Sequence, residues 1–206
     1  VLRASSKTAF LKTLEEPPKH AIFILATTEK HKIIPTILSR CQIFDFKRIT
    51  VEDIAKHLAW VAEQEGITAD PDALHLIAQK ADGALRDSLS IFDRIASFSD
   101  QNISYESVLE NLNILDYDYY FRAVEHIQSG SVKDVLLLFR EVLDKGFDGH
   151  MFLTGLASHL RDLLVGKDQA TLALLEVGEN IRQRYVEQSG KVDLPFLIKA
   201  LKICTE

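Results

Sequence analysis

The sequence predicts a mainly α-helical protein that begins with a short segment of alternating helices and strands. Three observations support this fold class. In residues 1–49, apolar runs of helix length alternate with apolar runs of strand length, as in an α/β layer. After Arg48 the apolar residues recur only at helical spacing. Glycine and proline then divide the rest into a bundle of three short helices and a set of longer helices.

The composition is typical of a globular protein with a substantial core. The chain has 206 residues, of which 47% are hydrophobic and 26% are charged. No apolar run approaches the roughly 20 residues that cross a bilayer, and no signal peptide is recognisable. The chain opens with Val1 rather than methionine, and the apolar Leu2 and Phe10 follow. We therefore expect a fragment that begins inside a domain.

Cysteine content and charge narrow the class of protein further. Cys41 and Cys204 lie far apart and form no CxxC pair, which favours a reducing compartment and argues against a disulfide or metal framework. The net charge is −6, yet residues 1–50 hold nine Lys and Arg against four Asp and Glu. This basic segment fits a surface that faces phosphate, and it also fits an ordinary solvated surface.

The α/β part is expected to end in a strand that leads into the helical region. Pro17 and Pro18 end its first helix, because a residue that precedes proline avoids the helical conformation. The run AIFILA is continuously apolar, which predicts a strand buried on both faces. The expected order is helix 4–16, strand 21–26, polar loop 27–32, helix 34–39 and strand 42–46.

The next part is expected to be a small three-helix bundle. Thr50 caps its first helix and Gly66 ends it. Asp70 and Pro71, a cap followed by proline at the first helical position, start the second helix, and Gly83 separates it from the third. The third helix carries an apolar stripe of Leu85, Leu89, Phe92 and Ala96.

Longer and more apolar helices follow the polar break at 99–104. They are separated at glycines 130, 146 and 190, and we expect them at 116–129, 131–145, 148–166, 178–189 and from 192 onward. The predicted domains are therefore residues 1–49, 50–102 and 103–206.

Common catalytic and metal motifs are absent from the sequence. The two Gly-Lys pairs, at 166–167 and 190–191, lack both the upstream glycine and the Ser or Thr of a P-loop. The seven histidines form no HxxxH pair and have no neighbouring cysteine, so no metal site is expected. Ser39 and Cys41 have no base close to them in sequence, which favours packing or turn roles over nucleophilic ones.

Four other features remain to be interpreted. The tyrosines of DYDYYF (116–121) could stack on bases, although a face packed in the core is favoured. Arg40, in TILSRCQIF, has no acid or base near it in sequence, and we expect it to lack a local partner. Arg86, in GALRDSLS, begins a polar stripe, and taken alone it fits a surface arginine paired with Asp82 or Asp87. Thr27 and Thr28 follow a predicted strand, where ligands bind in open α/β sheets.

These features occur in the order found in a known protein family. The segments KTLEEPP, IFILATTEKHKIIPTILSRCQIFDF and GALRDSLSIFD resemble the clamp-loader ATPases of the AAA+ class, in particular the bacterial DNA polymerase III tau/gamma family. The resemblance is dense over residues 8–98. In residues 100–206 only the helical character and the length agree.

The resemblance implies a role for each candidate residue. Thr27 and Thr28 would belong to the sensor 1 segment, which senses the γ-phosphate or orients the attacking water. Arg40 would be an arginine finger that reaches the nucleotide of a neighbouring subunit, and Arg86 would be sensor 2, which contacts ATP in its own subunit. Residues 1–49 would then close an AAA+ ATPase domain, 50–102 would form a lid, and the helices from 103 would form a collar that joins subunits.

The resemblance also implies a function, cofactors and partners. The intact protein would use ATP and Mg²⁺ to load a sliding clamp onto primed DNA, together with delta, delta-prime and further tau/gamma subunits, in the cytoplasm and away from membranes. The Walker A and B segments and a four-cysteine zinc module should precede Val1. We therefore expect the fragment to bind no cofactor and to be inactive alone.

Two alternatives compete with this interpretation. A non-hydrolysing subunit similar to delta-prime would donate Arg40 without cleaving nucleotide, whereas the lid arginine Arg86 favours the tau/gamma type. A stand-alone helical scaffold would leave both arginine motifs as coincidences.

Overall fold

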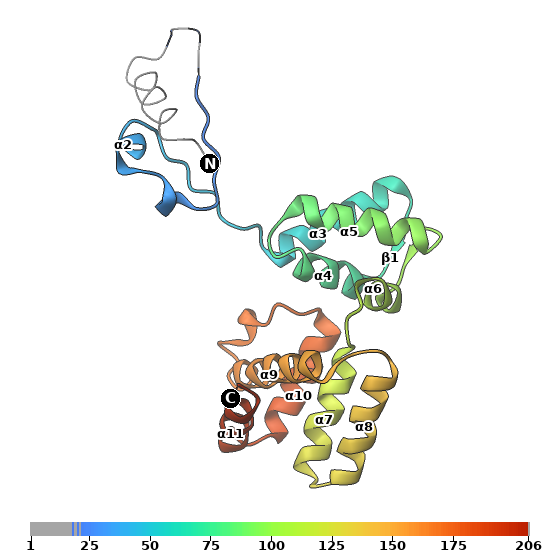
Figure 1. Cartoon of the computed structure of the whole chain (residues 1–206). Helices are drawn as coiled ribbons and strands as arrows, with labels where there is room; N and C mark the ends of the chain where they lie inside the picture. The colour runs from blue at the N-terminus through green and yellow to red at the C-terminus, as the bar shows by residue number, and fades with distance from the viewer. Residues whose placement is uncertain (1–17, 19, 21, 206) are drawn as a thin grey trace. The chain divides into compact units, whose positions relative to one another are not determined.

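The computed structural model describes residues 18, 20 and 22–205, and this part of the chain is mainly α-helical (Figure 1). It holds ten α-helices, two short 3₁₀ helices and two strands of two residues each. The predicted fold class is therefore confirmed. The chain separates into two compact units, Val1–Lys47 and Arg48–Glu206. The predicted helix 4–16 lies outside the described residues.

The N-terminal unit contains the 3₁₀ helix η1 (Lys30–Lys32) and the short helix α2 (Pro35–Leu38). Pro35 starts α2 at the first helical position, where its missing N–H is not needed. An ion pair of 3.1 Å joins the Lys30 ammonium to the Asp45 carboxylate. Helix 34–39 is thus confirmed in shortened form.

The predicted strands at 21–26 and 42–46 are wrong for the chain by itself. The described residues of both segments are irregular, and their apolar side chains are exposed, with Ile22 at 90% and Phe46 at 94%. A strand needs a neighbour to pair its N–H and C=O groups, and no described residue supplies one here. The apolar runs are present, but their described side chains remain exposed.

Four helices and a two-stranded sheet form the first bundle, which we define as residues 50–112. Its elements are α3 (Val51–Glu65), β1 (Thr68–Ala69), α4 (Pro71–Lys80), α5 (Leu85–Phe98), β2 (Asn102–Ile103) and α6 (Tyr105–Leu112). The strands run parallel, with Thr68 opposite Asn102 and Ala69 opposite Ile103.

Local sequence signals explain where these helices begin and end. The Thr50 hydroxyl accepts a hydrogen bond of 3.1 Å from the Asp53 N–H, and Asp70 caps α4 in the same way. Gly66 ends α3 in the left-handed conformation. The sequence predicts three helices here. In the structure α6 is a fourth, because Val108 is fully buried in the same core as Ile54, Leu58, Ile77 and Phe92.

The second bundle, residues 116–205, has a separate core. Its elements are α7 (Tyr117–Gln128), α8 (Val132–Asp144), α9 (Gly149–Val165), η2 (Leu172–Leu174), α10 (Glu179–Lys191) and α11 (Leu194–Thr205). Helix α8 lies beside α7, and α11 packs against α9 (Figure 1). The largest fully buried side chains are Tyr185, Leu138, Leu160, Leu163, Leu197 and His159.

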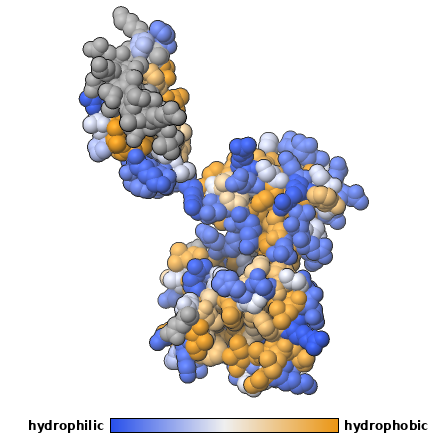
Figure 2. All heavy atoms as spheres, in the orientation of Figure 1, coloured by the Kyte–Doolittle hydropathy of each residue, from blue (hydrophilic) through white to orange (hydrophobic). Residues whose placement is uncertain are grey.

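The surface of the second bundle carries several large aliphatic side chains. Val132, Leu136 and Leu137 on α8 are more than half exposed, as is Ile198 on α11. Figure 2 shows apolar residues gathered over this bundle on the face in view. None of the described helices combines the length and the apolar character needed to cross a bilayer.

Candidate functional site

Arg40 lies in the turn that ends α2. This turn is closed by backbone hydrogen bonds from Arg40 N–H to Ile37 C=O (3.0 Å) and from Cys41 N–H to Leu38 C=O (3.2 Å). The exposed guanidinium donates through Nη1 to the Thr36 carbonyl at 2.8 Å. The expectation that Arg40 lacks a local partner is therefore wrong. Arginine near a helix C-terminus commonly binds the last carbonyls, and here one of them orients the side chain.

The two neighbours of Arg40 have structural environments. The Ser39 hydroxyl donates to the Thr36 carbonyl at 3.2 Å and also lies 3.4 Å from the Arg40 Nη1. Cys41 is a half-buried free thiol. These contacts fit the turn and packing roles that the sequence favours over nucleophilic ones.

Thr27 and Thr28 are both exposed and stand just before η1. The Thr27 hydroxyl accepts a hydrogen bond of 3.0 Å from the Glu29 N–H, which fixes the start of this turn. Lys30 and Lys32 follow and pair with Asp45 and Glu29. Two hydroxyl groups thus lie beside basic side chains on a surface of the N-terminal unit.

Arg86 is exposed in the first turn of α5, immediately after a tight left-handed turn. Asp82 and Gly83 have φ values of 48° and 81°. A Cβ on Gly83 would lie 2.6 Å from the Arg48 Cβ, so only glycine fits both the conformation and the close approach. The Ile49 N–H also donates to the Gly83 carbonyl at 3.3 Å. The entry into the first bundle is therefore bound to the turn that presents Arg86.

The competing interpretation of Arg86 as a paired surface arginine receives no support within the described residues. Asp82, one proposed partner, pairs instead with Arg48. No described carboxylate, Asp87 included, forms an ion pair with Arg86. Arg86 is exposed in the first turn of α5.

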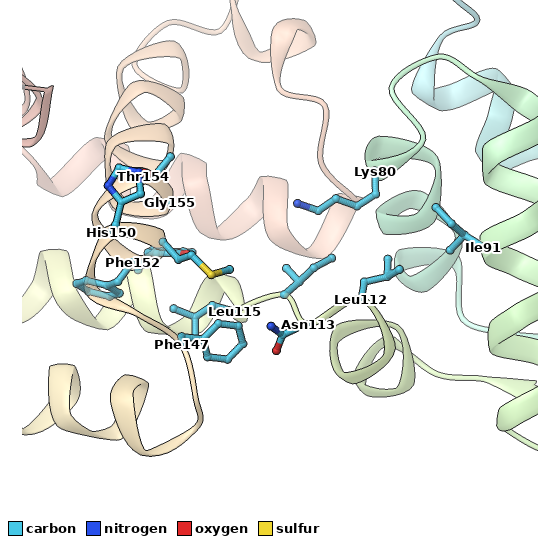
Figure 3. A pocket seen from close by; sticks show the side chains of 13 residues that line it. Lys80, Ile91, Leu112, Asn113, Leu115, Phe147, His150, Phe152, Thr154 and Gly155 are labelled. Carbon is cyan, nitrogen blue, oxygen red and sulfur yellow. The ribbon is translucent and has the colours of Figure 1, made fainter.

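The four predicted residues are divided between the two units of the chain. Thr27, Thr28 and Arg40 belong to the N-terminal unit, whereas Arg86 belongs to the unit that contains both bundles. The cleft shown in Figure 3 is lined by other residues, with Lys80 and Leu112 on one side and Phe147 and His150 on the other. Within residues 18, 20 and 22–205, no group of three His, Cys, Asp or Glu could hold a metal ion.

The tyrosine cluster is part of the core of the second bundle. Tyr119, Tyr120 and Phe121 on α7 are at least 90% buried, and burial raises the pKa of Tyr120 to about 12. The core interpretation is confirmed, and base stacking by these three rings is excluded because they are covered. Sequence reasoning missed their neighbour His159, whose polar contacts come from a helix that follows much later in the chain.

Two protein-family models match parts of this chain. A model described as DNA polymerase III, delta subunit, matches residues 1–50, and one described as DNA polymerase III clamp loader subunit, ATPase lid domain, matches residues 53–105. DNA polymerase III subunit tau of Bacillus subtilis is 37% identical over 187 residues, covering 89% of this chain and 33% of that protein. The gamma/tau subunit of Mycoplasma genitalium is 37% identical over 205 residues, or 98% of this chain and 34% of that protein.

The chain belongs to the DNA polymerase III tau/gamma family. Subunit tau of Escherichia coli agrees as well, with 35% identity over 182 residues, covering 84% of this chain and 28% of that protein. The chain thus spans about a third of the length of the tau/gamma relatives it matches. A solved structure, the Bacillus subtilis DNA clamp loader delta protein, aligns over 97% of this chain and 63% of its own with a TM-score of 0.45 and 13% identity. That score is too low to support a fold argument.

Proposed function

We propose that this chain is the nucleotide-sensing and assembly part of an ATP-dependent clamp-loader subunit, which loads a sliding clamp onto primed DNA during replication. The observation that carries the proposal is Arg40. It is exposed at the end of α2, in a chain of which 98% aligns with a gamma/tau relative. A guanidinium in that position suits a phosphate supplied from outside the chain, because it is always charged and binds oxygens through a planar fork.

Each candidate residue receives a role in the proposal. Arg40 acts in trans on the nucleotide of a neighbouring subunit, where such fingers contribute about 10³–10⁵ in rate, or roughly 4–7 kcal/mol. Thr27 and Thr28 supply hydroxyl groups for sensor 1, which senses the γ-phosphate or orients the attacking water. Arg86 donates from the first turn of α5 to the nucleotide of its own subunit, as sensor 2.

ATP and Mg²⁺ serve the longer protein, in which the nucleotide supplies the phosphoryl group that is transferred to water. The two arginines and two threonines fit phosphate oxygens, because all four are donors and all are exposed. The described residues offer no carboxylate cluster for Mg²⁺, so the metal ligands belong to other segments. The chain alone should consequently bind ATP only weakly.

The proposed partners are other clamp-loader subunits, namely delta, delta-prime and further tau/gamma copies, together with the sliding clamp and primed DNA. The apolar surface of the second bundle supports subunit association, because α8 and α11 leave large aliphatic side chains uncovered. The proposed location is the cytoplasm. Residues 1–49, 50–102 and 103–206 are proposed as the end of the ATPase domain, the lid and the collar.

A second candidate, a non-hydrolysing subunit that donates Arg40, is favoured by one finding. The family model that matches residues 1–50 is described as a delta subunit. The exposed Arg86 argues for the tau/gamma type, because a lid arginine serves a subunit that binds working nucleotide. ATP hydrolysis by the longer protein therefore separates the two candidates.

The test is Arg40→Ala in the full-length protein. Its own ATP binding should stay near the parent value, whereas hydrolysis in the assembled complex should fall by about 10³ if chemistry limits the rate, and by less if release does. Arg40→Lys should recover little, because an ammonium keeps the charge but not the planar fork.

A mixing experiment shows whether Arg40 acts in trans. Subunits with an intact Arg40 and an inactive P-loop are combined with Arg40→Ala subunits that still bind ATP. Hydrolysis should return only at interfaces where the intact arginine faces a working pocket. Recovery that ignores this pairing would contradict the proposal and leave Arg40 a role within its own chain.

A further inference from the structure

The two bundles have separate cores and an open junction. The buried apolar residues form two clusters, one within residues 54–108 and one within 115–197. A cleft of about 630 Å³ lies between the bundles, with Lys80 and Leu112 on one side and Phe147 and His150 on the other (Figure 3). Two bodies that share little packed core are able to rotate relative to each other.

A short connection joins the bundles and has the features of a hinge. Helix α6 ends at Asn113, which adopts the left-handed conformation with φ of 50°. Asp116 caps α7 only three residues later. Ile114 packs against the first core and Leu115 belongs to the second, so a backbone change between them would reorient one bundle while each side chain stays with its own core.

A second connection comes from the segment after η2 together with the first residues of α10, and it contacts α4. We call residues 175–181 the strap. The Asn180 side-chain amide donates to the Asp72 carboxylate at 2.6 Å, and the Gln79 amide donates to the Glu176 carbonyl at 3.1 Å. Asp72 and Gln79 are seven residues apart on α4, so they lie on the same face of the helix. The strap therefore follows that face for two turns.

Two further contacts fix the strap closely against α4. The Tyr117 hydroxyl donates to the Gln79 Oε1 atom at 3.1 Å, which holds the Gln79 amide in position. Gly178 lies so near Asp72 that a Cβ on it would overlap the carboxylate. A side chain at 178 would therefore displace the Asp72 carboxylate from its present position.

The seam beneath the strap contains polar atoms that the closed arrangement leaves unsatisfied. His75 Nε2 and the Tyr105 hydroxyl are buried and have no hydrogen-bond partner among the described residues. Both side chains line the same small cavity, together with Gly178 and Ile181 of the strap. Opening the seam would hydrate these two atoms and so offset the loss of the strap contacts.

We propose that the strap is a releasable latch, which fixes the angle between the bundles when closed and lets them pivot about residues 113–116 when open. Hydrogen bonds at exposed positions close it, and hydration of His75 and Tyr105 favours its opening. The latch goes beyond the proposed function, because it requires neither nucleotide nor a partner. It sets the orientation of the bundle that carries Arg86 relative to the bundle with the apolar surface.

The experiment measures the distance between the bundles by double electron–electron resonance on the full 206-residue chain. Spin labels are attached at Glu63→Cys on α3 and Lys133→Cys on α8, both exposed positions, in a background with Cys41→Ser and Cys204→Ser. Asn180→Asp places a second carboxylate against Asp72 and should open the latch. The double variant Asp72→Asn with Asn180→Asp exchanges donor and acceptor and should close it again.

We expect a single narrow distance distribution in the labelled parent and one at least about twofold wider in Asn180→Asp. The exchanged double variant should return to the parent width. Gln183→Glu, which adds the same charge at an exposed position of α10, should not differ from the parent.

Two results would overturn the latch. One is a parent-like distribution in Asn180→Asp, and the other is a parent distribution already as wide as that of the variant. If Asn180→Asp does not fold, as judged by circular dichroism, Gln79→Ala decides the question. It removes the second strap contact, and a width equal to that of the parent would reject the proposal.

Discussion

The Nδ1 atom of His159 lies 2.9 Å from the hydroxyl oxygen of Tyr185 in the core of the second bundle. Its Nε2 lies 3.1 Å from Gln188 Oε1, whose amide nitrogen donates to the Phe121 carbonyl at 2.9 Å. Because Gln188 Oε1 can only accept, Nε2 carries the proton and Nδ1 accepts from Tyr185. The network is complete only with a neutral imidazole, and burial lowers the pKa of His159 to about 4.

This network predicts that stability falls on acidification. The folded-state pKa of His159 is depressed below the unfolded value of about 6.5, so the unfolded chain binds more protons between these two values. The stability that the neutral imidazole contributes is fully present above about pH 6.5 and decreases as pH falls towards 4, by about 2–3 kcal/mol. Urea unfolding of the parent and of His159→Gln over this range measures the difference.

His150→Gln, an exposed position on the same helix, is the matched control and should keep the pH dependence of the parent. Burial raises the pKa of Asp162, so protonation of this carboxyl favours the folded state as pH falls, opposite to the effect of His159. The contribution of His159 is therefore measured as the difference between the parent and the variants. If His159→Gln kept the full acid sensitivity of the parent, the network would not be its source.

Gly155 should not tolerate a side chain. A Cβ there would overlap the hydroxyl and ring of Tyr120, which is held in the core by Phe152. We expect Gly155→Ala to destabilise the chain by about 1–3 kcal/mol. Gly190→Ala is the control, since nothing lies within 4 Å of its Cβ, and it should be neutral or stabilising by up to about 1 kcal/mol. Equal effects of the two substitutions in thermal unfolding would contradict this packing argument.

If Arg86 is sensor 2, as proposed, Arg86→Ala in the full-length protein should weaken the response to ATP in the same subunit, because a charged contact to the nucleotide would be lost. The loss expected for one charged hydrogen bond is about 1.5–3 kcal/mol, which corresponds to roughly 10–150-fold in affinity. Arg94→Ala, on the same helix, is the control. Unchanged nucleotide affinity in titration calorimetry would leave Arg86 as a surface residue.

The apolar face of α8 should drive association with like or sister subunits. Leu136 is 63% exposed and lies among further exposed aliphatic side chains. Leu136→Glu should shift sedimentation towards the monomer, whereas Arg140→Glu, a charge change at an exposed position of the same helix, should do so much less. A parent chain that stays monomeric with every clamp-loader subunit added would refute the collar assignment.

The sequence by itself determined most of the helical framework. Caps and breaks are local, so Thr50 with Asp53, Asp70 with Pro71, and Gly66 define helix ends that the structure reproduces. Gly83, in the motif around Arg86, predicts a turn between two helices. In the structure Asp82 and Gly83 both have positive φ at this turn. Apolar spacing identified the buried faces for the same reason, since the period of a helix is fixed.

Only the tertiary structure decided which segments meet. The apolar runs at 21–26 and 42–46 predict strands, yet a strand forms only when another strand pairs with it. Asp72 and Asn180 are 108 residues apart, and His159 and Tyr185 are 26 apart, so no local pattern could join either pair. Contacts at such separations depend on how whole helices pack, and packing is a property of the assembled bundles rather than of any one segment.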